Sequence, residues 1–155
     1  MLSFKTIDIN DDRGKVIEFR KDSFLISFGE ISGFGDEKEY LNWLEKKISN
    51  YPDGFVMVKK GDNIVGQLEL TIREYEDREI GYVNLYYLIP ENRGRGMGKQ
   101  LHQYALNFFE NHNVNEYHLR VSPTNINALK FYKKLGLEEV GPEVNGKVIR
   151  MKGTL

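Results

Sequence analysis

The sequence predicts an α+β domain in which a mixed, mostly antiparallel sheet of six or seven strands is flanked by about four helices. Two kinds of segment lead to this prediction: runs that alternate apolar and polar residues, and runs that repeat apolar residues at helical spacing. Their order is β-α-α-β-β-β-α-β-α-β-β, which favours one mixed sheet with helices on both faces. The 155 residues, 40% hydrophobic and 29% charged, are typical of one globular domain, here residues 1–155.

The first third contains one strand and two helices. The alternation over residues 3–9 predicts a strand with Phe4, Ile7 and Ile9 as inward positions. Apolar residues at helical spacing predict a helix over 12–28, with a candidate break at Asp22. A glycine-containing loop follows over 29–35. The next helix covers 36–49, and Asp36 at its start is a candidate N-cap.

The middle of the chain predicts a meander of strands. Residues 55–59 and 64–72 form two strands joined by a hairpin loop over 60–63, and the charged segment 74–78 forms a second hairpin turn. Side chains alternate between the two faces of a strand. We therefore expect two faces in the second strand: Val65, Gln67 and Glu69 on one, and Ile64, Gly66, Leu68 and Leu70 on the other.

The most informative segment is 80–113. An apolar strand over 82–89 is stopped by Pro90, a loop rich in glycine and arginine covers 93–99, and an amphipathic helix runs from about 96 to 112. The first N–H groups of a helix lack partners and the helix dipole adds partial positive charge there. Glycines let a phosphate approach the backbone. The segment therefore predicts a site for a phosphorylated ligand.

The last third contains three strands and one helix. We expect strands over 116–122, 137–140 and 147–152, with Asn145-Gly146 as a hairpin signal between the last two. The helix over 126–135 is stopped by Gly136, a helix C-terminal glycine. These exposed closing strands are compatible with a homodimer.

Composition excludes several classes of function. A net charge of −1 argues against a nucleic-acid partner, including one bound through the Arg-Gly-Arg-Gly stretch. The chain has no cysteine, and its three histidines have no ligand spacing, so we expect no metal site and no thiol-linked intermediate. No apolar run approaches roughly 18 residues and the N-terminus lacks a signal peptide. We expect a soluble cytoplasmic protein without a membrane partner.

Two common phosphate-binding motifs do not fit the loop. A P-loop requires G-x-x-x-x-G-K-[ST], but the run from Gly94 to Lys99 is one residue short and Gln100 replaces the hydroxyl residue. The dinucleotide fingerprint requires G-x-G-x-x-G near the start of a βαβ unit, whereas this loop follows an antiparallel meander.

The motif that remains is R-x-x-G-x-G, formed by Arg93, Gly96 and Gly98. Downstream stands N-x-x-A-x-x-x-Y-x-x-x-G, from Asn125 to Gly136. With these two motifs the chain resembles, over nearly its whole length, the GNAT family of Gcn5-related N-acetyltransferases, which use acetyl-coenzyme A. One departure is Leu137, where the family usually has a phenylalanine of similar volume.

The resemblance implies a coenzyme site and a proton donor. The loop amides would hold the coenzyme A diphosphate, and strand 82–89 would separate from strand 116–122 so that pantetheine pairs with it. An N–H near Leu88 would polarise the thioester carbonyl. Tyr132 would protonate the departing thiolate, whose pKa is about 8.5. The implied coenzyme site comprises Tyr87, Leu88, Ile89, Arg93, Gly94, Arg95, Gly96, Met97, Gly98, Lys99, Asn125, Ala128, Phe131 and Tyr132.

The implied reaction is direct attack of a primary amine on the acetyl carbon in a ternary complex. Glu69 is the first candidate for the base, with Asn84 and Tyr86 as the other candidates. The wall of the acceptor site would comprise Phe28, Ile31, Phe34 and Tyr40. Ordinary packing in the core and loops explains these four residues equally well. The acceptor, a small molecule or a peptide amine, stays open. The alternative function is a non-catalytic module that binds acetyl-coenzyme A as a sensor.

Overall fold

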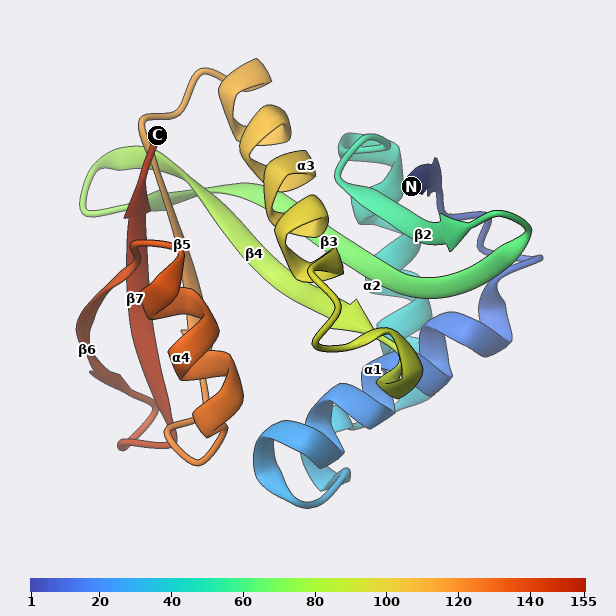
Figure 1. Cartoon of the computed structure of the whole chain (residues 1–155), viewed down its shortest axis with the longest axis horizontal. Coiled ribbons are helices and arrows are strands. Elements are labelled where there is room, and N and C mark those ends of the chain that lie inside the picture. Colours follow the sequence, from blue (N-terminus) through green and yellow to red (C-terminus); the bar gives the residue numbers. More distant parts are fainter.

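A computed structural model describes all 155 residues and contains one seven-stranded sheet (Figure 1). The strand order is β1-β2-β3-β4-β5-β7-β6, and every neighbouring pair is antiparallel except β4–β5, which is parallel. The predicted fold class and the predicted order of elements are confirmed. None of the helices has the length and apolar character that crossing a membrane requires.

The helices and strands lie close to their predicted positions. They are β1 (Leu2–Thr6), α1 (Arg13–Phe28), α2 (Glu37–Asn50), β2 (Phe55–Lys60), β3 (Asn63–Tyr75), β4 (Arg78–Leu88), α3 (Met97–Asn111), β5 (Glu116–Val121), α4 (Ile126–Lys134), β6 (Glu138–Glu143) and β7 (Val148–Thr154). Short 3₁₀ turns cover Ser32–Phe34 and Pro90–Asn92.

Helix α1 is continuous, so the candidate break at Asp22 is wrong. The polar pair that suggested a break makes contacts instead. The Ser23 hydroxyl donates to the carbonyl of Arg20 at 2.8 Å, and the Asp22 carboxylate accepts a hydrogen bond from the Tyr87 hydroxyl on β4. The Ser23 contact is local to the helix and the Asp22 contact is tertiary, so these polar residues do not mark a helix end.

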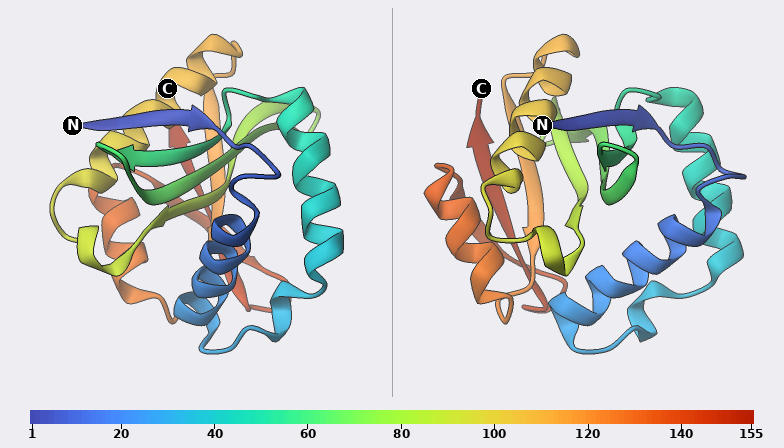
Figure 2. Two further views of the ribbon diagram at one scale, coloured as in Figure 1. Left: turned by 90° about the vertical axis from the view of Figure 1, so that its right-hand side faces the viewer. Right: turned by 45° about the vertical axis from the view of Figure 1, so that its right-hand side comes forward.

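Two hydrophobic cores lie on opposite faces of the sheet. Figure 2 shows α1 and α2 on one side of the molecule and α3 and α4 on the other. The α3-side core includes Leu68, Val83 and Phe109, whereas the α1/α2-side core includes Phe19 and Leu85. Both cores contain fully buried aromatic and aliphatic side chains, which supply most of the folding free energy of a domain this size.

Two bulges change which face a residue occupies. In β4, Leu85 pairs with Glu69 and Val83 pairs with Leu70, so Asn84 is an extra residue. As a result Val83 and Leu85, two positions apart, belong to different cores.

A similar irregularity in β3 leaves Val65 between the pairs Val58–Gly66 and Lys59–Ile64. Val65 packs in the α3-side core and Ile64 packs against the other core. The predicted faces of these two residues are therefore wrong. A bulge shifts the side-chain period by one residue, and the local sequence pattern carries no sign of it.

The β4–β5 pairing is short. It covers only Gly81–Tyr117, Tyr82–His118 and Val83–Leu119, although β4 continues to Leu88 and β5 to Val121. Figure 1 shows the two strands diverging beyond this point. The predicted separation of these strands is thus present, and it leaves one side of β4 unpaired.

An ion pair fixes the paired end of these strands. Arg78 Nε and Nη2 donate to the two carboxylate oxygens of Glu116 at 2.8 and 2.9 Å. This bidentate contact, with a smaller contribution from His118, lowers the pKa of Glu116 to about 2. The unperturbed value is 4.5.

We expect Glu116→Gln to flatten the acid side of the stability profile. A depressed carboxylate pKa adds stability that is present above pH 4.5 and is lost as the pH falls toward about 2. The wild-type free energy of unfolding should therefore fall more steeply over this window than that of the variant, measured by urea unfolding at each pH. The control is Glu138→Gln on β6, which removes a carboxylate without an ion pair. Equal slopes for wild type and Glu116→Gln would contradict the assignment.

Candidate active site

A cleft of about 1020 Å³ opens where β4 and β5 diverge. It is lined by parts of α1, β4, β5, α4 and the loop before α3, which lie far apart in the sequence. The structure brings most of the predicted site residues to this cleft: Phe28, Asn84, Tyr86, Tyr87, Leu88, Arg93, Gly94, Gly96, Gly98, Lys99, Asn125, Ala128, Phe131 and Tyr132.

Other predicted residues lie outside the cleft lining. Met97 is buried in the α3-side core, and Arg95 is exposed. Phe34 packs edge-on against the Tyr40 ring, with the two ring centroids 5.6 Å apart. Glu69 is fully buried and does not reach the cleft surface.

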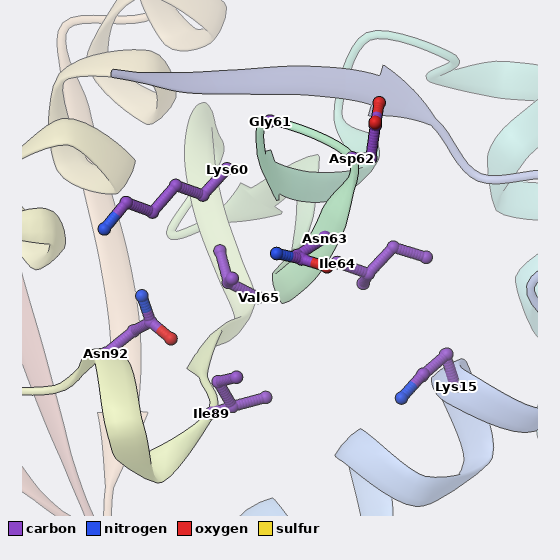
Figure 3. Close-up of a pocket in the computed structure, with 9 residues that line it drawn as sticks. All are labelled: Lys15, Lys60, Gly61, Asp62, Asn63, Ile64, Val65, Ile89 and Asn92. Carbon is purple, nitrogen blue, oxygen red and sulfur yellow. The ribbon is translucent and has the colours of Figure 1, made fainter.

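Ile89 lies at a second hollow, beside the turn between β2 and β3 (Figure 3). The hollow has a volume of about 830 Å³, and Figure 3 shows Lys15 and Lys60 on different sides of it. It shares no lining residue with the cleft. The side chain of Ile89 therefore faces a different surface from the other predicted coenzyme residues.

Backbone hydrogen bonds show which groups of β4 face the gap. The Ile89 N–H donates to the carbonyl of Val65 at 2.8 Å, so these residues form a hydrogen-bonded pair beside β3. Bonded and non-bonded pairs alternate along an antiparallel ladder, which makes Tyr86 and Leu88 the non-bonded positions. Their N–H groups point away from β3, toward the side that β5 has left.

The loop before α3 leaves backbone donors free. Gly96 is the N-cap of α3 with φ 80° and makes no side-chain capping bond. The first N–H groups of the helix consequently have no intrahelical or side-chain partner, and an anion can accept their hydrogen bonds. Gly98 permits close packing at this point, because a Cβ there would lie 2.9 Å from the Phe131 ring of α4.

The Arg93 side chain supports the backbone of β4. Its Nε donates to the carbonyl of Leu88 at 2.8 Å, and its Nη2 lies 3.2 Å from the Asp22 carboxylate on α1. Asp22 also accepts from the Tyr87 hydroxyl. Arg93 and Tyr87 thus tie α1 to the end of β4.

Tyr132, on α4, lines the cleft. The residue is half-buried, makes no hydrogen bond within the chain, and has its ring centroid 6.3 Å from that of Tyr86. Burial raises the pKa of Tyr132 to about 12, so its phenol is protonated at neutral pH. Asn125, also at the cleft, caps α4 by accepting from the Ala128 N–H at 3.3 Å.

Glu69 belongs to a buried polar network. One oxygen accepts from Arg20 Nη1 at 2.9 Å; the other accepts from Gln67 at 2.8 Å and from the Tyr40 hydroxyl. Burial raises the pKa of Glu69, and the charge of Arg20 opposes this shift. Arg20, whose side chain is 21% exposed, lies at the cleft in its place.

Of the wall that α1 contributes to the cleft, the sequence reasoning found only Phe28. Five lining residues on α1 have the spacing i, i+3, i+4, i+7 and i+8, and they are Arg20, Ser23, Phe24, Ser27 and Phe28. This spacing places them on one helix face. A search of the helix for polar and aromatic residues that recur at helical spacing could have found this face. Nowhere do three or more His, Cys, Asp or Glu side chains gather in a group that could hold a metal ion.

A sequence model of the acetyltransferase (GNAT) family matches residues 16–137, most of the chain and all of the cleft segments except Val148. The chain belongs to this family. A relative among curated proteins is an uncharacterized N-acetyltransferase of Methanocaldococcus jannaschii, 31% identical over 103 residues. The match covers 64% of this chain but only 44% of that relative's length.

Solved acetyltransferase structures share the fold. The PaiA N-acetyltransferase of Thermoplasma acidophilum, solved in complex with coenzyme A, has a TM-score of 0.76 at 20% identity, with 100% of this chain and 99% of that chain covered. Arabidopsis thaliana Naa50, solved with the bisubstrate analogue CoA-Ac-MVNAL, has a TM-score of 0.71 at 18% identity, with 99% of each chain covered.

Proposed function

We propose that this GNAT protein transfers the acetyl group of acetyl-coenzyme A to a primary amine, by direct attack within a ternary complex. The observation that carries the proposal is the β4–β5 ladder, which stops after three pairs beside the uncapped start of α3. Backbone donors along one strand edge and at one helix N-terminus then face a single cleft.

The free donors fit two parts of coenzyme A. The backbone N–H groups at the start of α3 would donate hydrogen bonds to a diphosphate, because they are unpaired and lie at the positive end of the helix dipole. The outward N–H groups of Tyr86 and Leu88 would bond pantetheine as a strand partner does. The coenzyme A bound in the PaiA structure and the CoA-Ac-MVNAL bound in the Naa50 structure support coenzyme A as the ligand.

The chemistry needs a proton donor and an oxyanion donor. Coenzyme A supplies the activated thioester. The neutral amine attacks the acetyl carbon, a C–N bond forms and the C–S bond breaks. Tyr132 donates its phenolic proton to the departing sulfur. The N–H of Tyr86 or Leu88 would stabilise charge on the carbonyl oxygen. The chain has no cysteine that could carry the acetyl group.

Glu69 is best explained as a positioning residue. Both of its oxygens are engaged, and the Arg20 ion pair would have to open before it could accept a proton from an amine. These contacts favour a role in holding Arg20 at the cleft over the predicted role of base. The amine proton would then pass to solvent water.

We expect Glu69→Gln to weaken the fold while leaving the pH profile in place. The amide keeps a partner for Tyr40 but leaves the Arg20 charge unpaired, so the free energy of unfolding should fall by about 1–3 kcal/mol. The acidic limb of kcat/KM against pH should remain. Its disappearance, with the fold intact, would assign Glu69 as the base.

Thiol release tests the proposed function directly. The protein is incubated with acetyl-coenzyme A and a panel of primary amines, both as small molecules and as peptide N-termini, and free thiol is followed. We expect release that depends on the amine, with intersecting initial-rate lines typical of a ternary complex. Coenzyme A binding without turnover on any amine would instead favour the non-catalytic sensor.

A further inference from the structure

One face of β3 is polar from Gln67 to Arg73. Gln67, Glu69, Thr71 and Arg73 alternate on this face, and contacts from α1 and α2 reach only the first two: Arg20 pairs with Glu69, and Tyr40 contacts both Gln67 and Glu69. Arg73, farther along the strand, is exposed. Thr71 is still buried, so this face becomes an open surface only around Arg73.

Four arginines of this surface have carboxylate partners. Arg20 Nη1 lies 2.9 Å from Glu69, and Arg78 Nε lies 2.8 Å from Glu116. The Nε atoms of Arg120 and Arg150 each lie 2.8 Å from an oxygen of Glu143. Glu69, Glu116 and Glu143 are thus already paired.

Arg73 differs from these four, because no carboxylate lies within ion-pair distance of it. Its guanidinium stacks 3.8 Å from the ring centroid of Tyr82, and its Nη2 donates to the Asn84 side-chain oxygen at 2.6 Å. Partial desolvation of the guanidinium, with repulsion from Arg120 and Arg150, lowers the pKa of Arg73. The guanidinium is held in place, and its charge is uncompensated.

Asn84 connects Arg73 to the cleft. It is the extra residue of β4, directly after the last pair with β5, and it lines the cleft. Its side-chain oxygen accepts from Arg73, while its main-chain carbonyl accepts from Arg20 at 3.3 Å. Two guanidinium groups therefore flank the residue at which the cleft opens onto this face, and only Arg20 is neutralised by a carboxylate.

We propose that the amine acceptor carries a carboxylate and that Arg73 binds it, so that the acid group selects the substrate. This inference rests on the proposed acetyl transfer. Arginine suits the role because its planar guanidinium offers two parallel hydrogen bonds to a carboxylate. The stacking on Tyr82 and the bond to Asn84 fix the plane of the guanidinium before the acceptor binds.

Matched acceptors test the proposal. One pair is 4-aminobutanoate and 4-aminobutanamide; the other is a tetrapeptide with glutamate at its second position and its glutamine counterpart. We expect kcat/KM to favour the acid over the amide by about tenfold or more in at least one pair. The pair with the larger ratio distinguishes a small-molecule acid from an acidic peptide. Equal rates for acid and amide in both pairs would overturn the proposal.

Three variants locate the preference. Arg73→Gln should bring the acid-to-amide ratio close to one, and Arg73→Lys should keep part of it, because the charge stays but the fork is lost. The control is Arg13→Gln at the start of α1, an exposed arginine without an ion pair, which should keep the wild-type ratio. Thermal melting identifies any variant that does not fold.

Calorimetry separates this inference from the proposed function. The acid and amide probes are titrated into the protein with and without coenzyme A, which requires no turnover. Tighter binding of the acid, lost in Arg73→Gln, would support the acid site even if no amine is acetylated. Equal or absent binding of acid and amide would overturn the inference, while amine-dependent thiol release would leave the transferase assignment intact.

Discussion

Tyr132→Phe should lower kcat by about 10²-fold or more, the usual loss when a general acid is removed. The residue lines the cleft, its hydroxyl has no hydrogen-bond partner within the chain, and its raised pKa, about 12, keeps the proton available at neutral pH. The ring that packs on the cleft wall is unchanged by the substitution. The Kd for coenzyme A should therefore change less than kcat, as measured by calorimetry beside steady-state kinetics.

A second tyrosine serves as the control for this variant. Tyr104→Phe removes a hydroxyl on α3 that donates to the Asp53 carbonyl at 2.6 Å, outside the cleft. Its effect on kcat should be small. If kcat of Tyr132→Phe stays close to that of Tyr104→Phe, the thiolate leaves without help from Tyr132 and the assignment of the acid fails.

Gly96→Val should weaken coenzyme A binding by about 10- to 100-fold, the equivalent of losing one or two charge-assisted hydrogen bonds. The residue has φ 80°, a region that a β-branched side chain adopts only with strain. The backbone that aims the first amides of α3 would shift, and a branched side chain would stand at the loop. The Kd of S-acetylpantetheine, which lacks the diphosphate, should change much less.

The matched control for this variant is Gly61→Val, at the turn between β2 and β3. That glycine also has a positive φ, 61°, and it lies at the second hollow, away from the cleft. Comparable strain at Gly61 should leave coenzyme A affinity unchanged. An equal loss of affinity for coenzyme A and S-acetylpantetheine in Gly96→Val would place the defect elsewhere than in diphosphate binding.

Local sequence patterns were sufficient for the elements and for the uncapped start of α3. The stripe of Leu101, Ala105 and Phe109 predicted α3, and all three residues are buried in the α3-side core. The glycines before this helix indicated free backbone amides, because an uncapped helix start is a local property of the chain. The separation of β4 from β5 came from family resemblance and not from periodicity.

The parts that were missed depend on residues far apart in the chain. Glu69 has the alternation of an ordinary strand residue, but Arg20, 49 positions earlier, engages it in the folded protein. The bulges at Val65 and Asn84 shift the neighbouring side chains to the other face of the sheet, and no residue type in the sequence marks this shift. Such features are set by how elements pair, and a window of neighbouring residues does not contain that information.

The extra residue in β4 connects the packing of both cores to the cleft. Since Val83 is anchored in one core and Leu85 in the other, the short backbone span around Asn84 joins two independently packed layers. Loosening either layer would move that span and hence the mouth of the cleft that Asn84 lines. Core substitutions far from the cleft should then change turnover before they unfold the protein. Both cores would have this effect through the same short segment around Asn84.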